Sequence, residues 1–261
     1  MAAILIPARW GSSRFPGKPL VHLNGRPLIQ HVWERACASR AARRVIVATD
    51  DMRIAECAFA FGAEVALTSR RHPSGTDRIA EVAAKLRSEA LVINVQGDEP
   101  FVDPELIDRL VEFLRAHPRV PMVTAAAPLR DKSAFLDPNI VKAILAPDGR
   151  ALYFSRAPVP VNRDGGLPKM AFHHLGIYGY RRSFLLKFVT WKPTPLEKLE
   201  KLEQLRALEH GAEIRVLTAK NASPGIDTPS QLAALDGKRP PTTDTEQRRS
   251  PKARQGSMSR H

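Results

Sequence analysis

Continuous apolar runs alternate with segments of helical periodicity along the first half of the chain. Residues 2–6, 45–48 and 91–95 contain no alternating polar positions, which is typical of strands buried on both faces. This alternation predicts an α/β fold in which helices cover both faces of a parallel sheet. The same signals predict further strands at 64–67 and 122–127, and helices at 27–39, 51–61, 74–86 and 103–116.

Beyond about residue 130 the pattern is less regular and richer in proline. It predicts strands at 141–145, 151–154, 175–180 and 213–218, and helices at 184–189, 195–208 and 228–235. In the helix at 195–208, the Glu and Lys positions predict a solvated face and four leucines predict a buried one: Leu199, Leu202, Leu205 and Leu208. The final segment, 237–261, has almost no apolar residues, so we expect one domain at 1–236 and a disordered basic tail at 237–261.

Composition and charge limit the classes of function. The chain has 261 residues, 43% of them hydrophobic, and two cysteines. No apolar run is long enough to span a membrane, so we expect a reduced, cytoplasmic protein without a membrane partner. Of the net charge of +13, +5 falls on the tail and +8 on the rest. A positively charged domain can bind nucleic acid, nucleotides or sugar acids. The few Tyr and Trp are not interleaved with basic residues as in nucleic-acid-binding surfaces, so any nucleic-acid binding is expected on the tail.

A long loop follows the first strand, where ligands bind in open α/β sheets. Residues 7–19 combine Gly, Ser and Pro with the cations Arg9, Arg14 and Lys18. Small residues let backbone N–H groups approach a ligand, so this loop suits a polyphosphate, and an ordinary surface loop fits the composition equally well.

Two aspartates stand at chain positions that suit Mg²⁺. Asp98 follows the strand at 91–95, and Asp227 precedes the last predicted helix. Mg²⁺ is bound through one or two carboxylates together with substrate phosphates, but a turn or helix-capping role explains each aspartate alone. On the strand at 175–180 and just before it, alternation places His174, Tyr178 and Tyr180 on one face, which suits either a ligand or a half-buried strand.

Seven segments occur in the same order as in the 3-deoxy-manno-octulosonate (Kdo) cytidylyltransferase family: PARWGSSRFPGKPL, HPSGTDR, NVQGDEP, ALYFSRAPVP, HHLGIYGYR, PLEKLEKLEQLR and GIDTPSQL. The chain resembles this family over about residues 2–236. The resemblance implies a mixed, mostly parallel sheet flanked by helices in a Rossmann-like nucleotidyltransferase fold, with sugar-pocket and dimerisation elements in 130–212. It also implies transfer of CMP from CTP to the anomeric hydroxyl of Kdo with release of pyrophosphate, a Mg²⁺ cofactor, a homodimer and supply of CMP-Kdo for lipopolysaccharide biosynthesis.

Site residues are carried over position by position from the resemblance. It implies catalytic roles for Lys18, Arg9 and Asp98, and metal binding by Asp98 and Asp227. The residues implied to bind the nucleotide are Pro7, Ala8, Arg9, Ser13, Arg14, Lys18, Ser74, Gly75 and Thr76. The residues implied to bind the sugar are Arg78, Gln96, Arg156, His174, Tyr178, Glu203 and Gln204. No general base stands out, so we expect charge neutralisation and orientation to dominate the reaction.

One region departs from the family pattern. Residues 158–164 lack the Trp-Asp pair often found after the Ser-Arg-Ala step, and the loop at 165–171 is short. We expect both segments near the sugar pocket. A modified form of Kdo or another sugar acid therefore stays open as the substrate.

Overall fold

The computed structural model describes residues 1–11 and 15–237. The strands of its main sheet are β1 (Ala2–Ala8), β4 (Arg44–Thr49), β5 (Glu64–Leu67), β6 (Leu91–Asn94), β7 (Met122–Pro128), β8 (Lys142–Leu145), β9 (Ala151–Ser155), β10 (Phe172–Arg181) and β11 (Ile214–Thr218). The helices are α1 (Leu28–Cys37), α2 (Met52–Ala60), α3 (Gly75–Lys85), α4 (Pro104–Ala116), α5 (Lys132–Leu136), α6 (Arg182–Phe188), α7 (Pro195–Glu200), α8 (Gln204–Glu209) and α9 (Pro229–Leu235).

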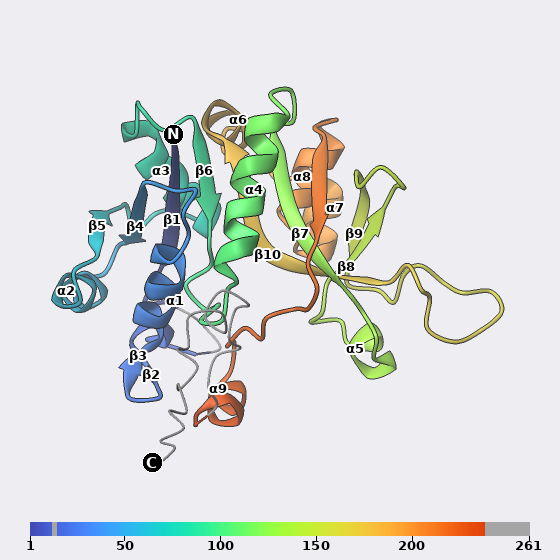
Figure 1. The fold of residues 1–261 in the computed structure, drawn as a ribbon, viewed down its shortest axis with the longest axis horizontal. Helices are drawn as coiled ribbons and strands as arrows, with labels where there is room; N and C mark the ends of the chain where they lie inside the picture. The colour runs from blue at the N-terminus through green and yellow to red at the C-terminus, as the bar shows by residue number, and fades with distance from the viewer. Residues whose placement is uncertain (12–14, 238–261) are drawn as a thin grey trace, which may run out of the picture.

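The main sheet is mixed, with the order β11-β7-β10-β6-β1-β4-β5 (Figure 1). The strands along this path run parallel except β10, which is antiparallel to both β6 and β7. Strand β8 also pairs with β10, and β9 pairs with β8. The predicted α/β class with a mixed, mostly parallel sheet is confirmed.

Two apolar cores lie on opposite faces of the sheet. Neighbouring β1 residues enter different cores, Ile4 one and Leu5 the other, as the two-residue period of a strand requires. Helices α1, α2 and α4 contribute to the first core, and α3, α6 and α8 to the second. Because both faces are covered, β1, β4 and β6 are apolar along most of their length, and this is the pattern from which they were predicted.

The prediction of one continuous helix at 195–208 is wrong. The segment forms two short helices, α7 and α8, separated at Lys201, which has a left-handed backbone (φ 56°). Glu197 and Arg206 form an ion pair between two side chains that are each less than 10% exposed. Packing these charges inside rotates Leu199 outward, where it is 78% exposed instead of buried. The periodicity of apolar residues cannot reveal a buried ion pair between two short helices.

The loop predicted between β1 and α1 contains further short elements. A 3₁₀ helix, η1 (Lys18–Leu20), precedes a small hairpin of β2 (His22–Leu23) and β3 (Arg26–Pro27). Helix α5 was also not predicted, because five residues are too few to show a period. None of the helices in the described residues is long and apolar enough to cross a membrane. The predicted tail at 237–261 lies almost wholly outside the described residues, so its disorder stays a prediction.

Candidate active site

Two adjoining pockets open at the carboxyl ends of β1 and β6. The first, of about 210 Å³, is lined by Pro7, Ala8, Arg9, Lys18, Pro19, Gly75, Arg78, Gln96, Gly97, Asp98 and Asp227. The second, of about 450 Å³, includes Thr76, Glu99, Asn139, Arg156, His173, His174, Tyr178, Glu203 and Gln204 in its lining. Four residues line both pockets: Gly75, Gln96, Asp98 and Asp227. Groups bound in the two pockets would therefore meet beside the two aspartates.

Lys18 joins the two aspartates at the boundary between the pockets. Its ammonium lies 2.5 Å from Asp98 Oδ2 and 3.0 Å from Asp227 Oδ1. The Lys18 side chain is 13% exposed, whereas those of Asp98 and Asp227 are 30% and 49% exposed. Carboxylates that lie 129 positions apart in the sequence thus converge on one cation.

Ile226 explains why Asp227 reaches this position. Its side chain is fully buried in a small apolar cluster with Leu23, Leu28 and Phe101. Its backbone N–H donates to the carbonyl oxygen of Asp98 at 2.9 Å. Burial and the main-chain hydrogen bond together hold the segment that carries Asp227 against the segment that follows β6.

Gly97 permits a close approach between the ends of β1 and β6. A Cβ atom at this position would lie 2.8 Å from the carbonyl oxygen of Pro7, a separation that real side chains do not tolerate. The absence of a side chain lets the two strand ends form one continuous floor for the first pocket.

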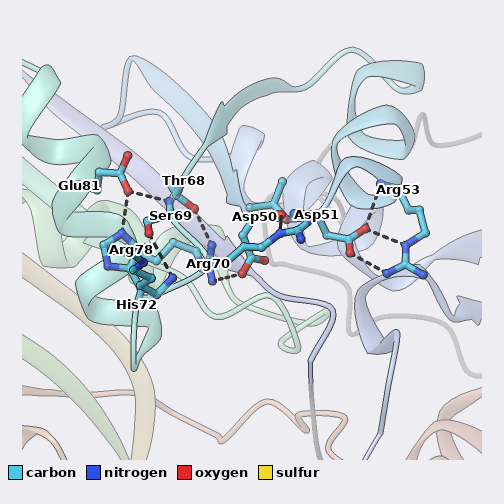
Figure 2. A network of polar contacts seen from close by, with 11 residues as sticks. Asp50, Asp51, Arg53, Thr68, Ser69, Arg70, His72, Arg78 and Glu81 are labelled. Carbon is cyan, nitrogen blue, oxygen red and sulfur yellow. Dashed lines mark hydrogen bonds and ion pairs between the residues drawn. The ribbon is translucent and has the colours of Figure 1, made fainter.

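A polar network fixes the segment between β5 and α3 (Figure 2). Arg78 is 3% exposed; its guanidinium donates to Asp50 Oδ2 at 2.9 Å and to Thr68 Oγ1 at 2.5 Å. Nearby, Glu81 accepts hydrogen bonds from the Ser69 backbone and the His72 ring, and these contacts lower the pKa of Glu81 to about 2. Arg78, predicted on the sugar side, lines the first pocket and not the second, and its charge is paired with Asp50.

Arg156 supplies a cation to the second pocket. Its Nε donates to the carbonyl oxygen of Glu200 at 2.8 Å, and its Nη1 donates to that of Pro138 at 3.0 Å. Its backbone N–H donates to the Glu200 carboxylate. Among the described residues, no carboxylate forms an ion pair with the Arg156 guanidinium. Held by neutral carbonyls, this cation remains available to an anionic ligand.

A row of rings forms one wall of the second pocket. His174 lies 5.4 Å from Tyr178 and Tyr178 lies 5.8 Å from Tyr180, measured between ring centroids, so the predicted shared face is confirmed. Burial lowers the pKa of His174 to about 3, with a smaller contribution from His173. The Thr124 hydroxyl donates to the Ile177 carbonyl oxygen at 2.7 Å and lies 3.0 Å from His174 Nε2. Because that hydroxyl proton is already used, we assign the proton of the neutral imidazole to Nε2.

The beginning of α3 contacts the beginning of α8 across the second pocket. The Thr76 hydroxyl donates to Glu203 Oε2 at 2.6 Å. Gln204 is 4% exposed, and its Nε2 has no hydrogen-bond partner among the described residues. This buried amide is therefore a donor left for a ligand.

Most of the predicted site residues come together at these two pockets. Ser74 is different: it caps α3, with its hydroxyl bonded to both the backbone and the side chain of Asp77, and it lines neither pocket. Ser13 and Arg14 lie outside the described residues. The loop at 158–171, expected near the sugar pocket, contributes no lining residue and extends away from the sheet (Figure 1).

The polar lining residues missed by sequence reasoning include Glu99, Asn139, His173 and Lys201. Glu99 directly follows Asp98, and its Oε1 would lie 3.0 Å from a Cβ at Gly176. Burial raises the pKa of Glu99 to about 8, with further contributions from Asp98 and Asp227. Glu99 could have been predicted as a site residue because it directly follows Asp98 in the segment QGDEP. No feature of the sequence pointed to Asn139.

The donor set at the pocket boundary suits Mg²⁺. Asp98 and Asp227 present hard carboxylate oxygens that are partly open to solvent, and they converge on one position. In the described part of the chain, no group of three His, Cys, Asp or Glu side chains could hold an ion. Two carboxylates complemented by substrate phosphates are a typical Mg²⁺ environment.

Comparison with known proteins gives consistent matches over most of the chain. The sequence model of the cytidylyltransferase family matches residues 3–214. A 3-deoxy-manno-octulosonate cytidylyltransferase of Pseudomonas syringae pv. syringae is 52% identical over 242 residues, which cover 88% of this chain and 94% of that protein. The corresponding protein of Syntrophotalea carbinolica is 47% identical over 240 residues, covering 89% and 96%. The solved structure of a CMP:2-keto-3-deoxy-manno-octonic acid synthetase complexed with CTP has a TM-score of 0.86 and 40% identity, covering 90% of this chain and 96% of that one.

Proposed function

The chain belongs to the 3-deoxy-manno-octulosonate cytidylyltransferase family, and on this premise we infer that it transfers CMP from CTP to Kdo and releases pyrophosphate. One observation carries the assignment of the site. The two pockets share a boundary at which Lys18, Asp98 and Asp227 converge. A nucleotide in one pocket and a sugar in the other would place the reacting phosphate and hydroxyl beside these three groups.

We assign CTP to the first pocket. Pro7 and Ala8 supply backbone groups at the end of β1, and Arg9 and Lys18 supply positive charge. Lys18 would neutralise charge on the α-phosphate, where negative charge must be stabilised as pyrophosphate leaves. Arg78 supports this pocket from behind through Asp50, so we assign it a structural role on the nucleotide side.

We assign Kdo to the second pocket. Kdo is an acid with several hydroxyl groups, so its site needs a cation together with mixed donors and acceptors. Arg156 is a cation of this pocket that forms no ion pair with a carboxylate among the described residues, and Gln204, Glu203 and Tyr178 supply polar groups. The unpaired amide of Gln204 has a natural partner in a sugar hydroxyl.

Asp98 and Asp227 would hold Mg²⁺. When bound there, the ion would neutralise phosphate charge and help to orient the triphosphate. The residues of the chain bring the two anionic substrates together, because Arg9 and Lys18 line the first pocket and Arg156 lines the adjoining second pocket. His174 is neutral and already hydrogen-bonded to Thr124, so it does not supply positive charge for the sugar acid.

Pyrophosphate release tests this function directly. Purified protein is assayed with Mg²⁺ and each of CTP, UTP and ATP, with and without Kdo. We expect release only with CTP and Kdo together, and a loss of at least 100-fold in Asp98→Asn, since this variant removes a charge at the shared boundary. Asp131→Asn is the matched control because Asp131 caps helix α5 and lines neither pocket, and asparagine also caps helices.

The outcomes separate the two halves of the assignment. Release with CTP and a different sugar acid, such as an amino-substituted Kdo, would keep the nucleotide half and change the sugar. No release with any nucleotide and sugar pair, from folded protein, would overturn the function.

We further propose that the chain acts as a homodimer in the cytoplasm, where CTP is made, and supplies lipopolysaccharide assembly. Exposed apolar side chains support the dimer: Leu152 on β9 is 49% exposed and Leu199 on α7 is 78% exposed. Sedimentation of the wild-type protein and of Leu199→Lys tests it. A monomeric wild-type protein at micromolar concentration would contradict it.

A further inference from the structure

Lys142 is a lysine buried completely behind the wall of the second pocket. Its ammonium donates to the main-chain oxygens of Asp137 at 2.9 Å and Ile140 at 2.6 Å. Lys142 does not line the pocket, but two residues that closely precede it in the chain do, namely Asn139 and Val141. Burial lowers the pKa of Lys142, so the charge is held in the interior at a cost.

The sheet places Lys142 between two strands of the pocket wall. On β8 it lies directly opposite His173 of β10 on one side and Ser155 of β9 on the other. Residues that lie opposite in neighbouring strands share a face of the sheet. Ser155 in turn donates its hydroxyl to Glu200 at 2.6 Å, and Arg156 is the next residue along the chain.

The turn at 137–140 links Lys142 to Arg156. Lys142 holds the carbonyls of Asp137 and Ile140, and the carbonyl of Pro138 between them accepts from Arg156 Nη1 at 3.0 Å. The other side-chain anchor of Arg156 is the Glu200 carbonyl. Lys142 therefore fixes one of the two main-chain oxygens that orient this guanidinium.

We propose that Lys142 is a positioning residue for the sugar-acid side of the pocket: it holds the 137–140 turn so that Arg156 and Asn139 face an anionic sugar. An apolar side chain of similar length would fill the same space, but it would remove the side-chain donor from both carbonyls. The Asp137 carbonyl would keep only the Ile140 N–H, at 3.1 Å, and the turn would be held less firmly. This role deepens the proposed function and rests on it.

Lys142→Met tests the proposal because it keeps the length and apolar stem of the side chain and removes the donors. We expect the KM for Kdo to rise at least tenfold, with the KM for CTP within twofold of wild type. Lys132→Met is the matched control, since Lys132 is exposed on the neighbouring helix α5. If Lys142→Met does not fold, Lys142→Gln is measured by the same criteria: its uncharged amide keeps the buried site polar, but it is one bond shorter than lysine and is not expected to hold both carbonyls.

A double-mutant cycle asks whether Lys142 acts through Arg156. If it does, Lys142→Met will change the KM for Kdo by less than twofold in the Arg156→Ala background. Equal rises in both KM values, or a full additional effect in that background, would overturn the role of Lys142 and leave the proposed function standing. A wild-type protein that releases no pyrophosphate with CTP and Kdo would overturn both.

Discussion

Replacement of Lys18 by methionine should strengthen divalent metal binding by the free protein while it abolishes turnover. The Lys18 ammonium lies between Asp98 and Asp227. A metal ion that binds both carboxylates must first displace this cation. Lys18→Met removes this competing cation, but it also removes the positive charge that we propose neutralises the α-phosphate.

The structure sets the size of the effect. The two carboxylate oxygens are at most about 5.5 Å apart, because they lie 2.5 and 3.0 Å from one nitrogen. At that separation two negative charges repel each other by about 0.8 kcal/mol in water and about 3 kcal/mol at an effective dielectric constant of 20. The exposure of the carboxylates, 30% and 49%, favours the lower part of that range. We expect the variant to lose about 1 kcal/mol of stability and to gain about tenfold in metal affinity.

Calorimetric titration with Mn²⁺ at 0.1 M salt, without nucleotide, measures the affinity. Thermal unfolding with and without Mg²⁺ measures stability, and the rise in Tm on adding Mg²⁺ should be larger in Lys18→Met than in wild type. Lys85→Met is the control, because the Lys85 side chain is 70% exposed, pairs with Glu81 on α3 and lines neither pocket. In Lys18→Met, kcat should fall at least 100-fold. Unchanged or weaker Mn²⁺ binding by a folded variant would refute the reasoning.

Three further predictions concern the support of the site. Ile226→Ala should cost about 2–4 kcal/mol of stability. Because Asp227 loses its anchor, the Mg²⁺ concentration needed for half-maximal activity should also rise. Urea unfolding measures the stability and a Mg²⁺ titration measures the requirement; an unchanged Mg²⁺ requirement would contradict the anchoring role. Gly97→Ala places a Cβ 2.8 Å from the Pro7 carbonyl oxygen, so the KM for CTP should rise at least tenfold in steady-state assays; a normal KM would show that the strand ends separate without cost. The folded-state pKa of His174, about 3, lies below the usual value near 6.5, so its contribution to stability is complete above pH 6.5 and is lost as the pH falls toward 3. Between pH 7 and pH 5 the wild type should therefore lose up to about 2 kcal/mol that His174→Gln does not lose, and parallel pH curves for the two proteins would contradict this assignment.

Local sequence signals located most of the elements accurately. The apolar run at 2–6 became β1, and the helices predicted at 74–86, 103–116 and 228–235 begin directly after Ser74, Asp103 and Thr228, which cap α3, α4 and α9. These features depend on neighbours within a few positions, so the chain carries them without reference to the rest of the fold. The failure at 195–208 had the opposite cause, because the buried pair of Glu197 and Arg206 outweighed a helical period.

The partner of each charged side chain could not be predicted from the sequence. Arg78 and Arg156 were both candidates to bind the acid group of the sugar. In the folded chain Arg78 pairs with Asp50, whereas Arg156 contacts only carbonyls through its side chain. Both residues are arginines that match a family motif, so the sequence does not distinguish them. Only packing decides which guanidinium is paired with a carboxylate and which can bind an anionic ligand.

The sequence by itself determined the α/β class, the order of strands and helices, and the presence of carboxylates and cations near the ends of strands. Its family resemblance added the reaction and the substrates. The tertiary structure alone decided that Lys18 lies between Asp98 and Asp227, and that buried Lys142 holds the turn beneath Arg156. The physical reason is distance along the chain: periodicity and capping act over a few residues, whereas contacts across 80 or 209 positions form only when the cores on both faces of the sheet are packed.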